Sequence, residues 1–286
     1  MRWHIIPTSA VVLSLIAVLV AGCAGAEPPA AETIGAARGS AAPAGQAPSP
    51  TGAAVAELPQ GDEPVDLDPA DFTPDIDNPY WPMPPGTRWI YREIDEEGNE
   101  LKVVVTVTGE TERIANGITA RVVRDTVTED GQLVEDTKDW YAQDAQGNIW
   151  YLGEDTAEFE NNEITSREGS WEAGIDGALA GVIIPADPAP GMRYRQEYYA
   201  GEAEDNGEVL STNELVEVPY GKFRDALLTK DTVATEPDVQ EYKLYAGDVG
   251  PVLVLGVSGG GGREELVAVD RVGAAAGTGP LGSPHP

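Results

Sequence analysis

The sequence is poor in the side chains that carry out much of enzymatic chemistry. Its 286 residues include one cysteine, Cys23, and two histidines, His4 and His285. Residues 24–284 therefore contain neither residue type. This absence excludes Ser-His-Asp and Cys-His catalysis in that part of the chain, together with zinc sites built from histidine and cysteine.

Positive charge is also scarce. The chain has 18 Lys and Arg against 49 Asp and Glu, which gives a formal net charge of −31. Residues 1–22 contribute only Arg2, so the remainder carries 17 basic and 49 acidic side chains, a net charge of −32. A surface this negative repels nucleic acid and anionic lipid headgroups, and we expect no nucleic-acid partner.

The N-terminus is typical of a secretory signal. Arg2 and His4 lie in a short polar segment, residues 10–19 are apolar, and small residues lead into Cys23. The apolar run is shorter than the roughly 20 residues that span a membrane, so we predict a cleaved signal peptide over residues 1–22.

The stretch Val20-Ala21-Gly22-Cys23 resembles the lipobox of bacterial prolipoproteins. In that family the cysteine thiol receives a diacylglyceryl group, and the cysteine becomes the N-terminus after cleavage. The resemblance implies that Cys23 is the lipidation site, with fatty-acyl chains such as palmitate. It also implies a cell-membrane protein that is lipid-anchored on the extracytoplasmic face, without a spanning helix.

Composition divides the rest of the chain. Residues 24–60 are mainly Ala, Gly, Pro, Ser and Thr, and such a segment buries too little apolar surface to offset its ordering entropy. We predict that residues 23–61 comprise the lipidated cysteine and a disordered linker, and that 273–286 form a disordered tail. Residues 62–272 remain as one β-rich domain.

This domain contains an internal repeat. Four short matches occur in the same order at offsets of 103 to 106 residues, which predicts two related units over about 80–168 and 185–270. The matches are Pro85-Gly86-Thr87-Arg88-Trp89 with Pro190-Gly191-Met192-Arg193-Tyr194, Arg124-Asp125-Thr126-Val127 with Lys230-Asp231-Thr232-Val233, Tyr141-Ala142-Gln143-Asp144 with Tyr245-Ala246-Gly247-Asp248, and residues 147–153 with 250–256.

Each unit has the pattern of β-structure. Leu101, Val103, Val105 and Val107 alternate with more polar residues, as in a half-buried strand, and Gly- and Asn-rich turns separate such segments. We predict an all-β fold, with two repeated antiparallel β-meander units in one sheet-rich domain. Residues 168–184 are the exception, because Ser170 and the residues after it predict a short helical connector.

Three patterns in the sequence are candidates for a metal, catalytic or ligand-binding site. The aspartates between Asp66 and Asp77 supply calcium-type ligands but lack the spacing of a known loop, and intervening prolines favour an extended arm. The GxSxG match at 256–260 lacks a base and a following helix, which favours a hairpin loop. Aromatic residues fit core packing or a ligand-facing shelf. We therefore predict no catalytic, cofactor or metal site.

The domain is similar only to extracytoplasmic bacterial proteins of unassigned function, and that resemblance implies no site residue. We expect a membrane-tethered lipoprotein, not an enzyme, whose β-domain binds a protein, glycan or lipid ligand or supports the envelope. One alternative is a lipid or hydrophobic-ligand carrier with an open half-barrel. Another is a carboxylate-based glycan hydrolase, which needs two acids across an aromatic-lined cleft.

Overall fold

The computed structural model describes residues 58–259 and 262–283, which are almost entirely β-structure. Its elements are η1 (a 3-10 helix, Pro69–Asp71), β1 (Phe72–Thr73), β2 (Thr87–Ile94), β3 (Glu100–Arg113), β4 (Thr119–Glu129), β5 (Gln132–Asp144), β6 (Ile149–Glu160), β7 (Glu163–Ser166), β8 (Trp171–Glu172), β9 (Leu179–Ile184), β10 (Arg193–Arg195), β11 (Glu197–Tyr198), β12 (Asp205–Val218), β13 (Gly221–Val233), β14 (Gln240–Ala246), β15 (Gly250–Ser258) and β16 (Arg263–Arg271).

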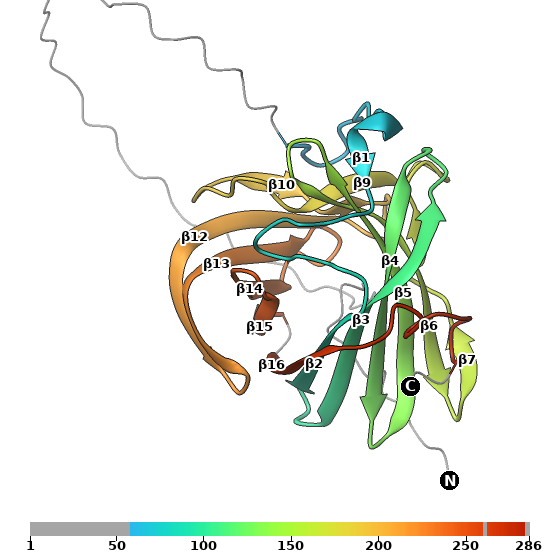
Figure 1. The fold of residues 1–286 in the computed structure, drawn as a ribbon, viewed down its shortest axis with the longest axis vertical. Coiled ribbons are helices and arrows are strands. Elements are labelled where there is room, and N and C mark those ends of the chain that lie inside the picture. The colour runs from blue at the N-terminus through green and yellow to red at the C-terminus, as the bar shows by residue number, and fades with distance from the viewer. Residues whose placement is uncertain (1–57, 260–261, 284–286) are drawn as a thin grey trace, which may run out of the picture. The chain divides into compact units, whose positions relative to one another are not determined.

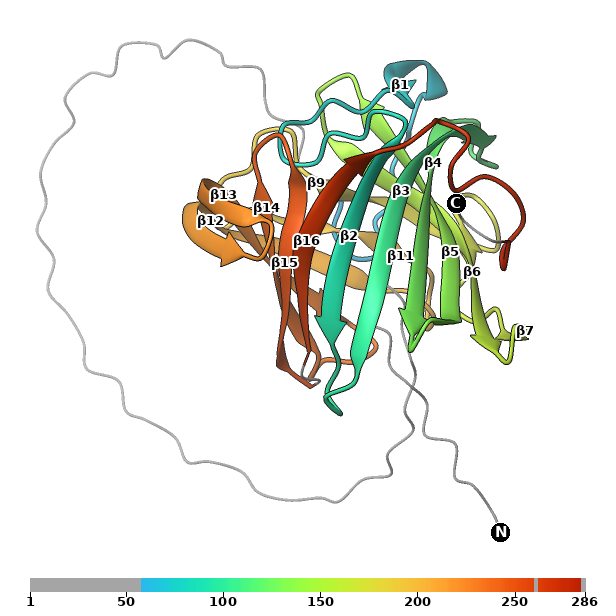
Figure 2. The ribbon, with the colours of Figure 1, turned by 60° about the horizontal axis from the view of Figure 1, so that its bottom comes forward.

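The strands form one strongly curved antiparallel sheet. Its order is β10-β12-β13-β14-β15-β16-β2-β3-β4-β5-β6-β9-β11, with β1, β7 and β8 paired alongside. The two end strands, β10 and β11, are consecutive in the chain, and the backbone N–H of Gln196 between them donates to Asp205 O at 2.7 Å. The sheet thus bends round until its ends nearly meet (Figures 1 and 2). The prediction of an all-β fold is confirmed.

The sheet contains two groups of four consecutive strands, one in each predicted unit. We call β3-β4-β5-β6 the first meander and β12-β13-β14-β15 the second meander, because in each the strands are neighbours in sequence and in the sheet. The turns that precede them match as well, since Gly86 donates to Val107 O and Gly191 donates to Val209 O, both at 2.8 Å. Strands β16 and β2 join the two meanders into one sheet, as predicted.

Alternation of side chains explains the local structure. Leu101, Val103 and Val107 of β3 are buried, whereas Glu100 and Lys102 point to solvent. In β4 the residues on both faces are buried from Ala120 to Val127, because the inner face lies against the core and chain segments from outside the meander cover the outer face. Such a strand shows no polar face in its sequence.

The helical connector is wrong. In the segment from 168 to 184, Trp171–Glu172 and Leu179–Ile184 form β8 and β9, both paired with β6. Between them Gly174 and Gly177 have φ values of +94° and +88°, left-handed conformations that no α-helix contains. Tertiary pairing with β6 therefore outweighs the local helix-start signal.

The domain is also larger than predicted at both ends. At residues 58–61, assigned to the linker, Pro59 O accepts from Arg195 N at 2.7 Å and Gly61 O from Arg195 Nη1 at 2.7 Å. In the predicted tail, residues 273–283 lie along the outer face of the first meander, where Gly279 O accepts from Arg124 Nη1 at 3.0 Å. Disorder is thus wrong for these residues, because buried arginines bind their backbone carbonyls.

Cys23 and the predicted signal peptide lie outside the described residues. Within residues 58–259 and 262–283, no helix has the length and apolar character needed to cross a membrane.

Candidate ligand-binding pocket inside the sheet

A small pocket lies inside the curve of the sheet. Its volume is about 80 Å³. A water molecule occupies about 10–15 Å³ on such a scale, and an engineered cavity of about 150 Å³ binds benzene, so this pocket has room for several waters or a ligand smaller than benzene. The residues that line it are Trp81, Tyr91, Val105, Val123, Asp125, Asp139, Tyr141, Pro251 and Glu264.

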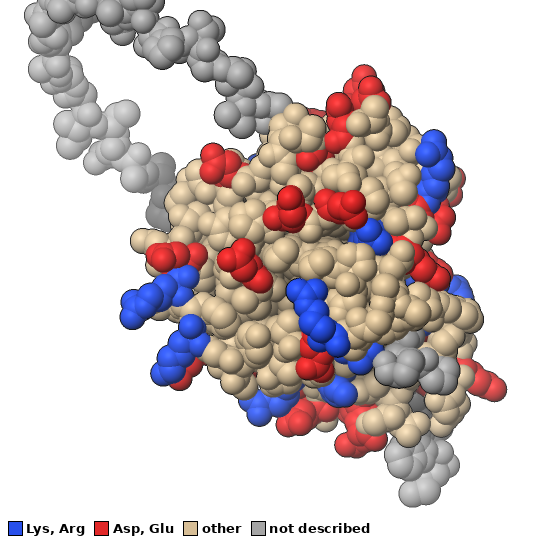
Figure 3. Space-filling view, viewed as in Figure 1, with Lys and Arg blue, Asp and Glu red and all other residues tan. Residues whose placement is uncertain are grey.

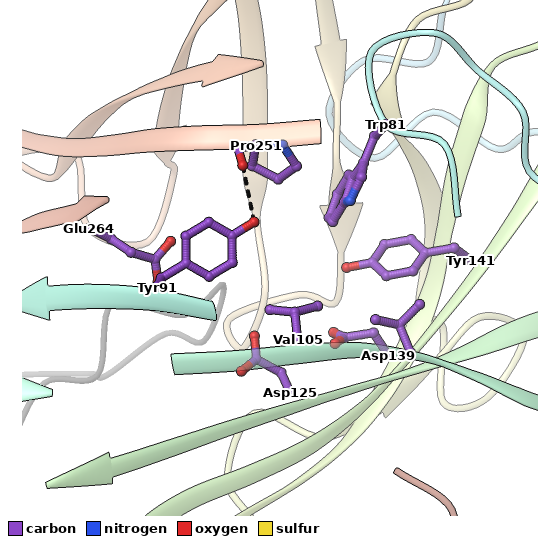
Figure 4. A pocket seen from close by; sticks show the side chains of 9 residues that line it. Trp81, Tyr91, Val105, Asp125, Asp139, Tyr141, Pro251 and Glu264 are labelled. Atoms are coloured by element: carbon purple, nitrogen blue, oxygen red, sulfur yellow. Dashed lines mark hydrogen bonds between the residues drawn. The ribbon is translucent and has the colours of Figure 1, made fainter. Parts of the chain in front are cut away.

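Several neighbouring strands contribute side chains to the pocket. Asp125 of β4 and Asp139 of β5 extend into it from neighbouring strands, while Tyr91 of β2 and Trp81 close other sides (Figure 4). Glu264 enters from β16. The lining residues lie on six strands that are neighbours in the sheet, β15-β16-β2-β3-β4-β5, together with Trp81 before β2, so the pocket forms within the curve of this part of the sheet.

Two of the acidic side chains are almost completely buried. Asp125 is 8% exposed, and its Oδ1 has no hydrogen-bond partner among the described residues. Asp139 is 5% exposed and accepts a hydrogen bond from the hydroxyl of Tyr151 at 2.8 Å. An unpaired buried carboxylate oxygen is costly, because nothing replaces the hydration that it loses.

Burial shifts the acid–base equilibria of these groups. It raises the pKa of Asp125 well above its usual value, and the carboxylate of Asp139 adds to the effect. Burial also raises the pKa of Asp139 to about 7, against the opposing effect of the hydrogen bond from Tyr151. The pKa of Glu264 rises to about 8, first through burial and then through repulsion by Glu93. All three groups thus favour the protonated form.

Aromatic rings form the opposite wall. The ring of Trp81 lies 5.4 Å from that of Tyr141 and 6.2 Å from that of Tyr245, centroid to centroid. Tyr91 donates its hydroxyl hydrogen to Pro251 O at 3.0 Å, which fixes the ring at the pocket. Trp81 thus packs between equivalent tyrosines of the two meanders, and the aromatic residues serve as core with one edge on the pocket.

The second meander has a different arrangement at the equivalent place. There Lys243 Nζ lies 2.9 Å from Asp231 Oδ2, and both side chains are more than nine-tenths buried. Burial disfavours the charged form of Lys243, but attraction to Asp231 and Glu241 outweighs it and raises the pKa of the amine well above its usual value. A buried aspartate is therefore paired with a cation in this meander.

More acidic groups continue round the interior. Glu154 Oε2 lies 2.9 Å from the hydroxyl oxygen of Tyr151, whose one hydrogen is shared between Glu154 and Asp139, and Glu197 is 1% exposed. Burial raises the pKa of Glu197 well above its usual value, and repulsion from Asp205 adds to this shift. The interior is thus acidic beyond the pocket itself.

The aspartates between Asp66 and Asp77 do not converge. Asp68 Oδ1 accepts from Ala70 N at 2.9 Å, Asp75 Oδ1 lies 3.2 Å from Arg121 Nη2, and Asp77 Oδ1 accepts from Gln143 Nε2 at 2.6 Å. Among the described residues, no group of three or more His, Cys, Asp or Glu side chains has the arrangement of a metal site. These aspartates fix an extended segment against the sheet.

The GxSxG match is at the end of β15, which stops at Ser258. β16 begins at Arg263 and pairs antiparallel with β15, so no helix follows the serine as a nucleophile elbow requires.

The sequence analysis did not identify Asp139 as a site residue, and it did not predict that Asp125 and Asp139 line the same pocket. The signal was present in the repeat. Extending the Tyr141–Tyr245 match backwards by two residues aligns Asp139 with Lys243, a reversal of charge at one position. Such a reversal between two copies of one unit marks the place where the copies differ chemically.

Comparisons with known proteins add little. No protein-family model and no curated protein matches the sequence. Among solved structures, the chain is similar to a Bacteroides fragilis protein with a YmcC-like fold, described as exported, at 14% identity and a TM-score of 0.39. It is also similar to a Parabacteroides distasonis protein described as a lipoprotein, at 12% identity and a TM-score of 0.34. Both matches cover 67% of this chain and 98% of the other.

Proposed function

We propose that the protein is a membrane-tethered extracytoplasmic lipoprotein whose β-domain binds a small polar ligand without chemical conversion. The observation that carries the binding role is the unpartnered Oδ1 of Asp125 in a pocket of about 80 Å³. Small-molecule sites combine apolar and aromatic walls with a few convergent polar groups, and this pocket has that composition.

The tether rests on the sequence. Val20-Ala21-Gly22-Cys23 follows an apolar run of signal-peptide length, and lipid chains on Cys23 would anchor the domain at the outer face of the membrane. Acidic side chains are spread over the face of the domain drawn in Figure 3, with Lys and Arg among them. A net charge of −31 favours cationic partners over anionic ones, and we propose no nucleic-acid partner.

The volume and lining of the pocket favour binding over the two alternatives. An acyl chain or a sugar unit requires more space, because typical ligand sites enclose about 300–1,000 Å³. Asp125 and Asp139 beside Trp81 do supply the two acids and aromatic wall that a glycan hydrolase requires. A volume of about 80 Å³ favours a ligand smaller than a sugar ring between these two acids.

Filling the pocket tests the binding role. Val105 is half-buried at its edge, so Val105→Phe should occupy the space while keeping an apolar side chain in β3. We expect saturation-transfer NMR with a panel of small polar compounds to detect binding to the wild type that this variant loses. If no compound in the panel distinguishes the two proteins, the pocket is not a ligand site.

Removing the acylation site tests the tether. In Cys23→Ala we expect loss of radiolabelled palmitate incorporation and release of the protein from the membrane fraction, because the thiol that accepts the lipid is absent. Cys23→Ser, with a hydroxyl in place of the thiol, should behave in the same way. Label that persists in both variants would place the acylation elsewhere.

A further inference from the structure

The geometry points to a specific ligand chemistry: the pocket binds the ammonium group of a small primary amine between Asp125 and Asp139, where the second meander has the side chain of Lys243. This inference rests on the proposed binding role and adds the charge and size of the ligand. Four observations carry it, namely strand register, charge balance, an unpartnered oxygen and the volume of the cavity.

Strand register shows that the two places are equivalent. Asp139 is paired with Val123 across β4 and β5, and Lys243 is paired with Thr229 across β13 and β14. Two residues further along the partner strand come Asp125 in the first meander and Asp231 in the second. Because these positions are two residues apart on one strand, both aspartates point to the same face as the residue at 139 or 243.

Charge balance differs between the two places. Asp231 and Lys243 form a buried ion pair, whereas none of the ion pairs among the described residues includes Asp125 or Asp139. The charged groups that act most on Asp125 are the carboxylates of Asp139 and Glu264. A cation between these carboxylates would replace their repulsion by attraction.

The walls of the pocket suit an ammonium ion. An ammonium group has three N–H donors, and the pocket offers the carboxylates of Asp125 and Asp139 from neighbouring strands, of which Asp125 Oδ1 lacks a hydrogen-bond partner among the described residues. The rings of Trp81, Tyr91 and Tyr141 line the pocket, and the face of an aromatic ring attracts a cation. A volume of about 80 Å³ limits the ligand to a few non-hydrogen atoms, as in methylammonium or ethylammonium.

Calorimetric titration of the full-length mature protein in a non-ionic detergent tests this inference. The probes are methylammonium and ethylammonium chloride at pH 8 in 0.15 M NaCl, with sodium chloride and ethanol as charge and size controls. We expect saturable binding of the ammonium ions, at least tenfold tighter than ethanol, and no saturable signal from added sodium chloride.

The key variant is Asp139→Lys, because it places an ammonium group opposite Asp125 as Lys243 is placed opposite Asp231. We expect it to fold, to melt at a higher temperature than the wild type and to bind ethylammonium at least tenfold more weakly. Asp125→Asn should also weaken binding at least tenfold. The matched control is Asp155→Asn. Asp155 lies on β6, where its exposed side chain pairs with Arg167, and this substitution should leave ethylammonium binding unchanged.

The outcomes separate the two proposals. If ethanol and ethylammonium bind equally well to the wild type, the pocket is a ligand site and the ammonium inference is wrong. If neither ethanol nor ethylammonium binds to the wild type, and no compound in the panel loses binding in Val105→Phe, then the proposal that the pocket binds a ligand is wrong as well. Undiminished ethylammonium binding by a folded Asp139→Lys or Asp125→Asn protein would place the cation elsewhere and overturn the inference.

Discussion

The two meanders share strand order and register, but the side chain next to the buried aspartate differs between them. In the second meander Asp231 has Lys243 as a partner at 2.9 Å. In the first, the equivalent Asp125 lies beside another acid, Asp139, at the wall of the pocket. The backbone therefore accommodates both arrangements, one with a lysine beside the buried aspartate and one with a second acid and a pocket beside it. The difference suggests a structural copy and a binding copy of the same unit.

The outer faces of the meanders differ as well. Arg124, which matches Lys230 in the repeat, is 1% exposed and forms an ion pair with the buried Asp136. The tail residues 273–283 cover this pair, whereas Lys230 remains partly exposed and pairs with Glu208 at 2.8 Å. Both faces of β4 are therefore enclosed from Ala120 to Val127, which holds this pocket-lining strand between two layers.

The largest effect should come from removing the built-in cation. Lys243→Met leaves Asp231 buried without its partner, and breaking a buried pair in this way typically costs about 3–5 kcal/mol. We expect a loss of this size in the free energy of unfolding from urea titration. Lys222→Met, at an exposed pair with Glu217, is the control and should cost less than about 1 kcal/mol. Similar losses in both variants would remove the distinction between the meanders.

A smaller loss should follow from uncovering the outer face of the first meander. Truncation after Val272 removes the carbonyls of Gly279 and Pro280 that accept from Arg124, and hydrogen bonds to charged groups contribute about 1.5–3 kcal/mol. Because water partly replaces them, we expect a net loss of about 2 kcal/mol in the same titration. Removing only residues 284–286 should have no effect. An unchanged stability after the longer truncation would mean that the tail does not support the meander.

The third effect should appear in the pH dependence of stability, where the change per pH unit is smaller than either loss above. Asp139 has a folded-state pKa of about 7, above its ordinary value near 3.9, so its contribution is fully present below pH 4 and is lost as the pH rises to 7. One such proton gives a slope of about 1.4 kcal/mol per pH unit. Asp139→Asn should make the decline between pH 5 and pH 7 shallower by about 1 kcal/mol per pH unit.

Urea titrations at several pH values measure this slope. Asp155→Asn, exposed on the neighbouring strand, should leave it unchanged. If Asp139→Asn declines as steeply as the wild type, the first meander does not keep an uncompensated buried acid at this position.

Much of the fold could be predicted because its signals are local. Alternation in β3 and the glycine turns near Gly86 and Gly191 occur within a few residues of each other, and the repeat places them in two units. The prediction of a helical connector was wrong because β8 and β9 form by pairing with β6. No local pattern in residues 168–184 indicates that pairing. The prediction of a disordered tail was wrong for the same reason, since residues 273–283 bind Arg124 and Asp136, which are far away in sequence.

The pocket was harder to predict than the fold. It requires β15 and β16 to lie opposite β4 and β5, a consequence of sheet curvature that a strand pattern does not fix. In a chain with 49 acidic residues, Asp125 and Asp139 are not distinctive by type. Only the comparison of the two repeat units, at the position shared by Asp139 and Lys243, separates them from the others.

The central claim is that the first meander has an acid, Asp139, where the second meander has Lys243, and that a ligand cation binds beside this acid. Carboxyl ¹³C NMR of the full-length protein, recorded during titration with methylammonium at pH 7 and constant ionic strength, tests it within one molecule. We predict saturable shifts for Asp125 and Asp139 as they lose protons to the ionised form, with no change for Asp231, whose partner is already present. Equal shifts at all three aspartates, or no shift at Asp125 and Asp139, would contradict the account.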